Sequence, residues 1–318
     1  MKPSDTIRAL KKSGKDIIAL VASDLHLSHK MPSARCDKHW YDVMGEYLMQ
    51  LEHARQEAGM IVPIFVAGDI FHLWNSPPEL INFAIKFMPE VWAVPGQHDL
   101  PLHDWGQIRR SAFWTLLEIG RIRMLGKAGT CFRDEYNLVN LVAYGFGWGV
   151  GISQPKETPG AVNLAIIHSY IWKHGASYPG AKVTDELRTW RDQLSNYHTA
   201  VFGDNHIGFF ENSDKGTNIM NCGTFLRRRS DEKDYQPMIG AIDSEGTIHP
   251  VPLDCSKDAF LDVVPPSTYA IDSFDDLMKE LAEGADGALD FAESVNRHDW
   301  KQYQPGVELY ITDIMEGK

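Results

Sequence analysis

Short aliphatic runs alternate with segments of helical periodicity in the first third of the chain. Residues 16–23, 61–68 and 90–94 are compact apolar runs with polar ends, which is typical of buried strands. Between them, apolar side chains in residues 39–58 and 79–88 recur with the spacing of helices. The strands are too apolar for a sheet with one solvent-exposed face. Their alternation with helices therefore predicts a sheet that is covered on both faces.

Strand patterns dominate the rest of the chain after a predicted helix at residues 104–118. They occur at 121–125, 138–144, 161–167, 199–202 and 218–220, and as a hairpin at 238–242 and 247–253. The only further helical pattern in this part covers residues 184–194. A second sheet packed on the first would account for this distribution. After Pro265 and Pro266 the chain becomes strongly acidic, which predicts a domain of residues 1–265 and a small appendage of residues 266–318.

Composition narrows the class of protein. The net charge of −12 argues against a protein that coats nucleic acid non-specifically, because a negative field repels phosphates. The 4 cysteines are scattered without a C-x-x-C pair, so neither a zinc ribbon nor a disulfide framework is indicated. The first residues lack an apolar signal core, and no run approaches the roughly 18 apolar residues of a membrane helix. We therefore predict a cytoplasmic protein without a membrane partner.

Five polar clusters follow strand-like runs. They are Asp24-x-His26, Gly68-Asp69, Gly96-Gln97-His98-Asp99, His168 and Gly203-Asp204-Asn205-His206. Carboxylates and imidazoles are the ligands of Mn²⁺, Fe²⁺ and Zn²⁺, and open α/β sheets bind ligands at strand ends. Two such ions, about 3.5–4 Å apart, clamp the attacking and leaving oxygens of a phosphoryl displacement. Each cluster alone is a weak signal, but their order and placement together predict a metal site.

The order of these clusters resembles the calcineurin-like metallophosphoesterase superfamily, whose pattern is D-x-H, G-D, G-N-H-D/E, H and G-H-x-H. The resemblance covers roughly residues 16–255. Finer details are similar to the SbcD-type nuclease subunits of DNA repair and recombination, and the compact length resembles their phage-encoded members. These details are Asp24-Leu25-His26-Leu27, Arg35, residues 67–71 and 94–99, and Asn221-Cys222-Gly223-Thr224. The implied fold is an α/β protein, a four-layer α/β/β/α sandwich.

The resemblance also implies roles for single residues. One metal ion would be held by Asp24, His26, Asp69 and His206, and the other by Asp69, Gln97, His168 and Asp204. Asp69 would bridge the two ions, His98 would donate a proton or contact phosphate, and Asp99 would orient His98. A metal-bound hydroxide would attack phosphorus. Two divalent ions are expected, Mn²⁺ first, with Mg²⁺, Fe²⁺ or Zn²⁺ as alternatives.

Two departures from the family pattern fall on the second ion. Gln97 stands where the family has Asn, and Asp204 stands where it has His. Because Gln97 is one methylene longer, the strand end must retreat or the second ion must shift, and the carboxylate of Asp204 favours Mn²⁺ or Mg²⁺ over zinc. A second ion site that is weak or lost, in a protein of low activity or regulatory role, is the alternative.

Four residues outside these clusters are candidates for substrate binding. His72 lies three positions after Asp69, and Arg227, Arg228 and Arg229 form a basic run on an acidic protein. Because the guanidinium of arginine pairs well with phosphate, the run could bind the phosphate backbone of a nucleic acid. It could equally be a solvated loop, and the sequence leaves both interpretations open. By resemblance, DNA is the expected substrate, with an SMC-like ATPase subunit and a homodimer as expected partners.

The leading hypothesis is therefore a metal-dependent phosphodiesterase that cleaves DNA as an exonuclease or endonuclease. The first alternative is a phosphatase or phosphodiesterase for nucleotides or small phosphoesters, which the negative charge favours and the arginine run opposes. The second alternative is a catalytically inactive scaffold that binds DNA or a partner, which Gln97 and Asp204 keep open.

Overall fold

The protein is described here from a computed structural model, which covers residues 2–59, 61–133, 139–156, 158–178, 181–213 and 216–261. Contacts between Cα atoms group the chain into two compact units. One unit contains Met1–Ser177 and Lys182–Val264, and the other contains Tyr178–Ala181 and Pro265–Lys318. The first unit carries the candidate site. The predicted appendage, residues 266–318, lies outside the described residues.

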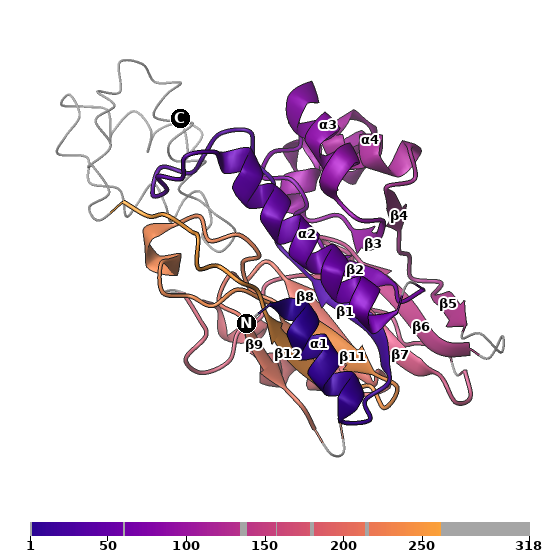
Figure 1. The fold of residues 1–318 in the computed structure, drawn as a ribbon. Coiled ribbons are helices and arrows are strands. Elements are labelled where there is room, and N and C mark those ends of the chain that lie inside the picture. The colour runs from indigo at the N-terminus through magenta and orange to yellow at the C-terminus, as the bar shows by residue number, and fades with distance from the viewer. Residues whose placement is uncertain are drawn as a thin grey trace. The chain divides into compact units, whose positions relative to one another are not determined.

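The first sheet has six strands in the order β12-β11-β1-β2-β3-β4. Its parallel strands are β1 (Ile17–Ala22), β2 (Ile64–Ala67), β3 (Val91–Val94) and β4 (Ile122–Met124). The hairpin of β11 (Met238–Asp243) and β12 (Ile248–Pro252) extends it, because β11 pairs antiparallel with β1. A segment from the end of the described chain thus lies beside its first strand (Figure 1).

The second sheet also has six strands, in the order β5-β6-β7-β8-β10-β9. Its parallel strands are β6 (Val139–Phe146), β7 (Val162–His168), β8 (Thr199–Gly203) and β10 (Asn218–Asn221). The short strands β5 (Thr130–Arg133) and β9 (Phe209–Glu211) pair antiparallel at the two edges. The prediction of a second sheet is confirmed.

The two sheets pack face to face, with helices on their outer faces. Buried side chains from both sheets, such as Val21, Phe65, Leu164 and Met220, form the layer between them. The outer face of the first sheet packs against α2 (Trp40–Ala58), α3 (Pro78–Phe87) and α4 (Ala112–Glu118). The helix α5 (Leu187–Leu194) packs on the outer face of the second sheet. The predicted four-layer α/β/β/α architecture is thus present.

Two helical regions differ from the sequence prediction. The expected helix at 104–118 is broken at Ser111, which ends the 3-10 helix Trp105–Arg110 and caps α4 through its side chain. The helix α1 (Pro3–Lys12) was not predicted, because Pro3 and Ile7 are its only buried residues. Polar contacts add to the packing of Ile7 in the core, since Lys11 Nζ donates to the carbonyl oxygens of Glu57 and Ala58 at the end of α2 (2.9 and 3.0 Å).

None of the helices in the described part of the chain combines the length and apolar character needed to cross a lipid bilayer.

Candidate metal centre

The candidate ligands gather where parallel strands of both sheets end. Asp24 and Asp69 lie two residues past β1 and β2, His168 is the last residue of β7, and Asp204 follows β8. Backbone pairing continues past the strand ends, because Asp24 N donates to Gly68 O (3.1 Å) and His26 N donates to Asp69 O (2.9 Å). This pairing fixes the two ligand-bearing turns against each other.

The backbone at these ligands adopts a conformation that most side chains avoid. Among the described residues, positive φ occurs at six non-glycine positions, and four of them are Asp24 (50°), His26 (41°), Asp69 (51°) and Asp204 (88°). Such conformations cost about 1–3 kcal/mol each and persist only where the surroundings enforce them. Their concentration at the predicted ligands indicates that backbone strain, which lowers the stability of the fold, accompanies the convergence of these side chains on one point.

Two glycines allow the turns to approach the ligands closely. A Cβ atom on Gly68 (φ +83°) would lie 2.1 Å from His168 Nδ1, and one on Gly96 would lie 2.0 Å from Asp69 Oδ1. Neither distance is compatible with a side chain, so the G-D and G-Q-H-D clusters need glycine for steric reasons.

Asp69 lies at the centre of the cluster and is 1% exposed. Its Oδ1 accepts a hydrogen bond from His98 N (3.0 Å), while its Oδ2 is buried without a hydrogen-bond partner among the described residues. That oxygen lies 3.7 Å from His26 Nε2 on one side and 3.4 Å from His168 Nε2 on the other. Burial alone would raise the pKa of Asp69, but the charges of His168 and His98 outweigh it and lower the pKa to about 2. Asp69 therefore presents one ionised oxygen to two imidazoles.

One half of the centre, which we call the histidine half, consists of Asp24, His26 and His206. Their ligand atoms lie within 4.8 Å of one another. The Nε2 atoms of His26 and His206 face each other at 3.1 Å. Two imidazole nitrogens bound to one ion at about 2.1 Å would be roughly 3.0–3.4 Å apart, so the spacing fits a shared cation. Burial and the neighbouring imidazoles lower the pKa of His26 well below its usual value, which keeps its ring neutral.

The other half, which we call the amide half, consists of Gln97, His168 and Asp204. Asp204 Oδ1 accepts from Gln97 Nε2 (2.6 Å), so the amide oxygen of Gln97 turns to His168 Nε2 (2.6 Å). His168 Nδ1 donates to Ala67 O (2.7 Å). Although burial opposes it, the charges of Asp69, Asp204 and Asp24 raise the pKa of His168 well above its usual value. A cation at Nε2 would have to replace a proton there.

The donors around Asp24 and Asp69 fit divalent cations, in the groups Asp24–His26–His206 and Asp24–Asp69–His168, neither of which includes Asp204. Asp69 Oδ2 is a buried carboxylate oxygen that needs a cationic partner, and Asp24, Asp69 and His168 also form a group whose ligand atoms lie within 4.8 Å. The donors are oxygens and imidazole nitrogens, which suit Mn²⁺, Fe²⁺ or Zn²⁺. Asp24 supports both groups, and its carboxylate also accepts from Asp204 N (3.0 Å).

The predicted pairing of Asp99 with His98 is wrong. Asp99 is fully buried, and its carboxylate accepts hydrogen bonds from the backbone N–H groups of Ile70 (3.2 Å), Phe71 (3.1 Å) and Gly96 (3.0 Å). The side chain turns inward because the chain after Asp69 leaves these N–H groups unpaired. Asp99 thus ties the Asp69 turn to the Gly96 turn. His98 is oriented by the carbonyl oxygen of His72, to which its Nδ1 donates (2.7 Å).

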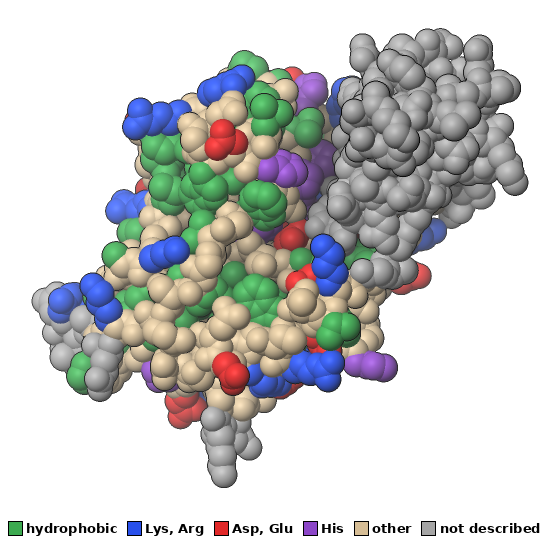
Figure 2. Space-filling model, turned by 180° about the vertical axis from the view of Figure 1, so that it is seen from behind, with side chains coloured by type: hydrophobic (Ala, Val, Ile, Leu, Met, Phe, Trp, Pro, Cys, Tyr) green, Lys and Arg blue, Asp and Glu red, His purple; other side chains and the backbone are tan. Residues whose placement is uncertain are grey.

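His72 lies beside the proposed catalytic histidine. The rings of His72 and His98 are stacked, with centroids 5.3 Å apart and an angle of 22° between them. Arg228 donates to His72 Nδ1 (2.8 Å), and since a guanidinium can only donate, the proton of neutral His72 is on Nε2. Both histidines are half-buried, and histidine side chains reach the surface beside hydrophobic ones in Figure 2. The structure therefore brings His72, His98 and Arg228 together at the edge of the centre.

The three arginines do not form one basic strip. Arg227 is 9% exposed, and its guanidinium bonds to Asp258 Oδ2 (2.8 Å) and to the backbone carbonyls of Lys233 (2.5 Å) and Cys255 (2.9 Å). Internal acceptors thus occupy the donors of Arg227, an arrangement that does not favour the predicted contact with substrate. Arg229 is at the surface and pairs with Asp231 (3.1 Å). Only Arg228 reaches the centre.

Sequence reasoning missed the residues that hold the His206 loop. Asn221 Nδ2 donates to Asn205 O (2.6 Å), and Thr224 N donates to His206 O (3.1 Å). Glu232 Oε1 lies 3.3 Å from His206 Nδ1. The segment 221–224 had been noted for its resemblance to a family segment, but its task of holding this loop was not predicted. A single Glu in a mixed charged run gives no signal that it reaches a ligand.

Comparisons with known proteins give a likeness in structure only. No protein-family model matches the sequence, and no curated protein matches it. Among solved structures, the chain is similar to a metallophosphoesterase from Sphaerobacter thermophilus, with 15% identity, 76% of this chain and 90% of that chain covered, and a TM-score of 0.36. It is also similar to the calcineurin-like phosphoesterase YfkN from Bacillus subtilis, with 11% identity, 74% and 87% covered, and a TM-score of 0.37. A 5'-nucleotidase from Candida albicans has 11% identity, 74% and 50% covered, and a TM-score of 0.41.

Proposed function

We propose that this protein is a metal-dependent phosphoester hydrolase and that its substrate is a phosphodiester of DNA. The observation that supports the first part is the position of Asp69 Oδ2, which is buried and lies between His26 Nε2 (3.7 Å) and His168 Nε2 (3.4 Å). A carboxylate oxygen between two imidazoles suits the bridge of a pair of cations. Asp24, His26, Asp69 and His206 would hold one cation, and Asp69, Gln97, His168 and Asp204 the other.

The bound cations would supply Lewis acidity toward phosphoryl oxygens and would lower the pKa of water. The chain's own groups have three further tasks. His98, with its Nδ1 proton directed at His72 O, can hold or accept a proton at Nε2. His72, with its Nδ1 accepting from Arg228, offers an Nε2–H donor. Arg228 adds positive charge beside both rings, so this edge suits the non-bridging oxygens of a phosphoester.

The assignment of DNA as substrate rests on the resemblance of residues 24–27, 67–71 and 94–99 to the SbcD-type nuclease subunits. One observation favours the alternative, a nucleotide or another small phosphoester. With Arg227 bonded internally and Arg229 paired to Asp231, the expected clamp for a phosphate backbone is reduced to Arg228. The net charge of −12 points the same way.

A competition assay tests both parts of the proposal. Protein loaded with Mn²⁺ is given bis-p-nitrophenyl phosphate in the presence of single-stranded DNA, duplex DNA or a nucleoside monophosphate. If DNA is cleaved and inhibits turnover of bis-p-nitrophenyl phosphate at a lower concentration than the nucleotide does, the nuclease is supported. If the nucleotide inhibits at the lower concentration, the enzyme for small phosphoesters is supported. Asp231→Asn, at an exposed position, serves as the matched control for the Asp69→Asn variant.

The inactive scaffold is distinguished by counting metal. Two bound transition-metal ions per chain, together with turnover of any phosphoester that Asp69→Asn abolishes, exclude it. One ion or none, with no turnover, would support it and contradict the proposed hydrolase. An SMC-like ATPase subunit and a homodimer remain proposals, and recovery of an ATPase with the tagged chain from its native cells is the direct measurement.

A further inference from the structure

The orientation of His206 is controlled from outside the metal centre. In the histidine half, His26 Nδ1 is buried without a hydrogen-bond partner among the described residues, so its ring has no second anchor there. His206 differs, because its Nδ1 lies 3.3 Å from Glu232 Oε1. Histidines that bind metals usually direct their other ring nitrogen at a carboxylate or carbonyl oxygen, which fixes both tautomer and orientation. In this half, His206 has such a partner.

The two oxygens of Glu232 have separate contacts. Oε2 accepts the backbone N–H groups of Arg228 (2.5 Å) and Arg229 (3.0 Å), which locks the side chain onto its own turn. Oε1 makes no hydrogen bond of ordinary geometry within the described residues, and it faces His206 Nδ1. The side chain is 6% exposed. A carboxylate held in this way by one oxygen can direct the other at the imidazole.

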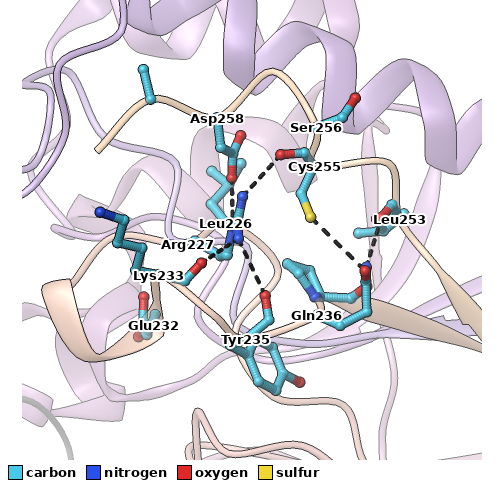
Figure 3. A network of polar contacts seen from close by, with 12 residues as sticks. Leu226, Arg227, Glu232, Lys233, Tyr235, Gln236, Leu253, Cys255, Ser256 and Asp258 are labelled. Atoms are coloured by element: carbon cyan, nitrogen blue, oxygen red, sulfur yellow. Dashed lines mark hydrogen bonds and ion pairs between the residues drawn. The ribbon is translucent and has the colours of Figure 1, made fainter. Parts of the chain in front are cut away.

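The turn that carries Glu232 is itself clamped by Arg227 (Figure 3). The guanidinium bonds to Lys233 O (2.5 Å) on the turn, and to Cys255 O (2.9 Å) and Asp258 Oδ2 (2.8 Å) on the segment that follows β12. Asp258 is held in turn by Arg35 (3.1 Å) and by the Tyr47 hydroxyl (2.8 Å). Moving the turn away from the segment after β12 would separate Arg227 from Asp258 and leave a buried charge unpaired. The network therefore ties the turn to that segment.

We propose that Glu232 is a positioning residue that keeps the His206 proton on Nδ1 and so directs the Nε2 lone pair at the cation shared with Asp24 and His26, and that the Arg227–Asp258 clamp holds Glu232 in place. This inference rests on the proposed metal-dependent function. It assigns a task to Arg227, whose internal bonds a role in substrate binding does not explain. It also connects the segment after β12 to the metal centre.

The Glu232→Gln variant separates positioning from a merely structural role. The new amide oxygen can still accept from the two backbone N–H groups, so the turn is retained. Its NH₂ group, however, would face His206 Nδ1 and require that nitrogen to accept. The proton would then move to Nε2, the nitrogen that faces His26 at 3.1 Å, and a cation could bind there only by displacing it.

The experiment is a titration of the full chain with Mn²⁺, in which free ion is followed by electron paramagnetic resonance. For Glu232→Gln we expect the tighter of two binding events to weaken by about 10- to 100-fold, with the melting temperature in EDTA unchanged. Asp258→Asn should weaken the same event to a smaller extent. Asp231→Asn, on the same turn but exposed, should bind as the wild type does.

Three outcomes overturn or redirect the inference. Wild-type affinity in Glu232→Gln overturns it. Equal weakening of both events together with a lower melting temperature in EDTA also overturns it, because Glu232 would then only stabilise the turn. If the wild type itself binds no Mn²⁺, or if Asp69→Asn binds as well as the wild type, the proposed function fails first and the inference fails with it.

Discussion

The two halves of the candidate metal centre differ in how their donor atoms are engaged. In the histidine half, the nitrogens of His26 and His206 face each other at 3.1 Å, an arrangement that attracts a cation. In the amide half, His168, Gln97 and Asp204 form a continuous hydrogen-bonded chain, with 2.6 Å at each link. A cation entering the histidine half must displace the proton of one hydrogen bond, between His26 Nε2 and His206 Nε2, whereas one entering the amide half must break two bonds and replace the proton on His168 Nε2. We therefore expect one tight and one weak ion.

This difference changes the meaning of the two departures from the family pattern. Gln97 and Asp204 do not simply lengthen or exchange ligands. Together they form an amide–carboxylate pair that satisfies itself, and we expect that pair to compete with metal binding. Burial, and beyond it the charges of Asp69 and Asp24, raises the pKa of Asp204 to about 6, so protons compete with a cation for this carboxylate below about pH 6.

The largest effect is expected from the residue common to both halves. Asp69→Asn keeps the size of the side chain and an acceptor for His98 N, but removes the charge between the two imidazoles. Both Mn²⁺ binding events should be lost, and turnover of a phosphoester should fall by about 1,000-fold, the upper range for loss of one preorganised electrostatic group. Mn²⁺ titration and steady-state kinetics measure these outcomes. Retention of either binding event would show that Asp69 is not shared.

The second prediction tests the halves against each other. His206→Gln should weaken the tight event by at least about 100-fold, more than loss of an outer partner of a ligand costs. Asp204→Asn should leave that event intact and remove only the weak one. Titration of both variants with Mn²⁺ gives the comparison directly. The reverse pattern, with the tight event lost in Asp204→Asn, would contradict the ranking.

The third prediction concerns the glycine that allows the halves to meet. Gly68→Ala puts a Cβ atom 2.1 Å from His168 Nδ1 in a left-handed backbone conformation, so His168 must shift. We expect a loss of about 1–3 kcal/mol in the free energy of unfolding and a specific weakening of the weak ion. Chemical denaturation in EDTA measures the first effect and metal titration the second. Gly120→Ala, also at positive φ but with no neighbour within 4 Å of the new Cβ, controls for backbone strain alone.

The smallest predicted effect has the opposite sign. Gln97→Glu replaces the donor that satisfies Asp204 with a second carboxylate, so the two side chains repel each other until a cation lies between them. We expect the weak ion to bind about fivefold more tightly, because added negative charge attracts a divalent ion. Unchanged or weaker binding in a calorimetric titration would mean that the Gln97–Asp204 bond does not limit the weak ion.

The positions of the ligands were predictable, whereas the partners of several side chains were not. Asp24, Asp69 and His168 follow apolar runs directly, and parallel strands deliver such residues to one edge. By contrast, a sequence does not reveal which way a side chain turns. Asp99 lies next to His98 in the chain, yet it bonds to the backbone at Ile70, Phe71 and Gly96, because those N–H groups lack other partners.

The partners of the three consecutive arginines were unpredictable for a related reason. Arg227, Arg228 and Arg229 are identical in the sequence, but one is buried with Asp258, one reaches His72 and one pairs with Asp231 at the surface. Their separation depends on Asp258, which follows 31 positions after Arg227. Short-range pattern cannot detect that partner. The helix α1 was missed because its apolar contact with the core is small, with Ile7 buried and Leu10 packed beside it, and charged contacts with the end of α2 supplement it.

The left-handed backbone at Asp24, Asp69 and Asp204 has a consequence for engineering. At these positions glycine relaxes the main chain, whereas alanine keeps its steric conflict. Exchange to glycine would therefore remove a candidate ligand and relieve strain in one step, so we expect that a variant without metal can have a higher melting temperature than its parent. Selection for thermal stability alone would favour such substitutions by glycine. Thermostable variants of this protein should therefore be tested for bound metal before they are used further.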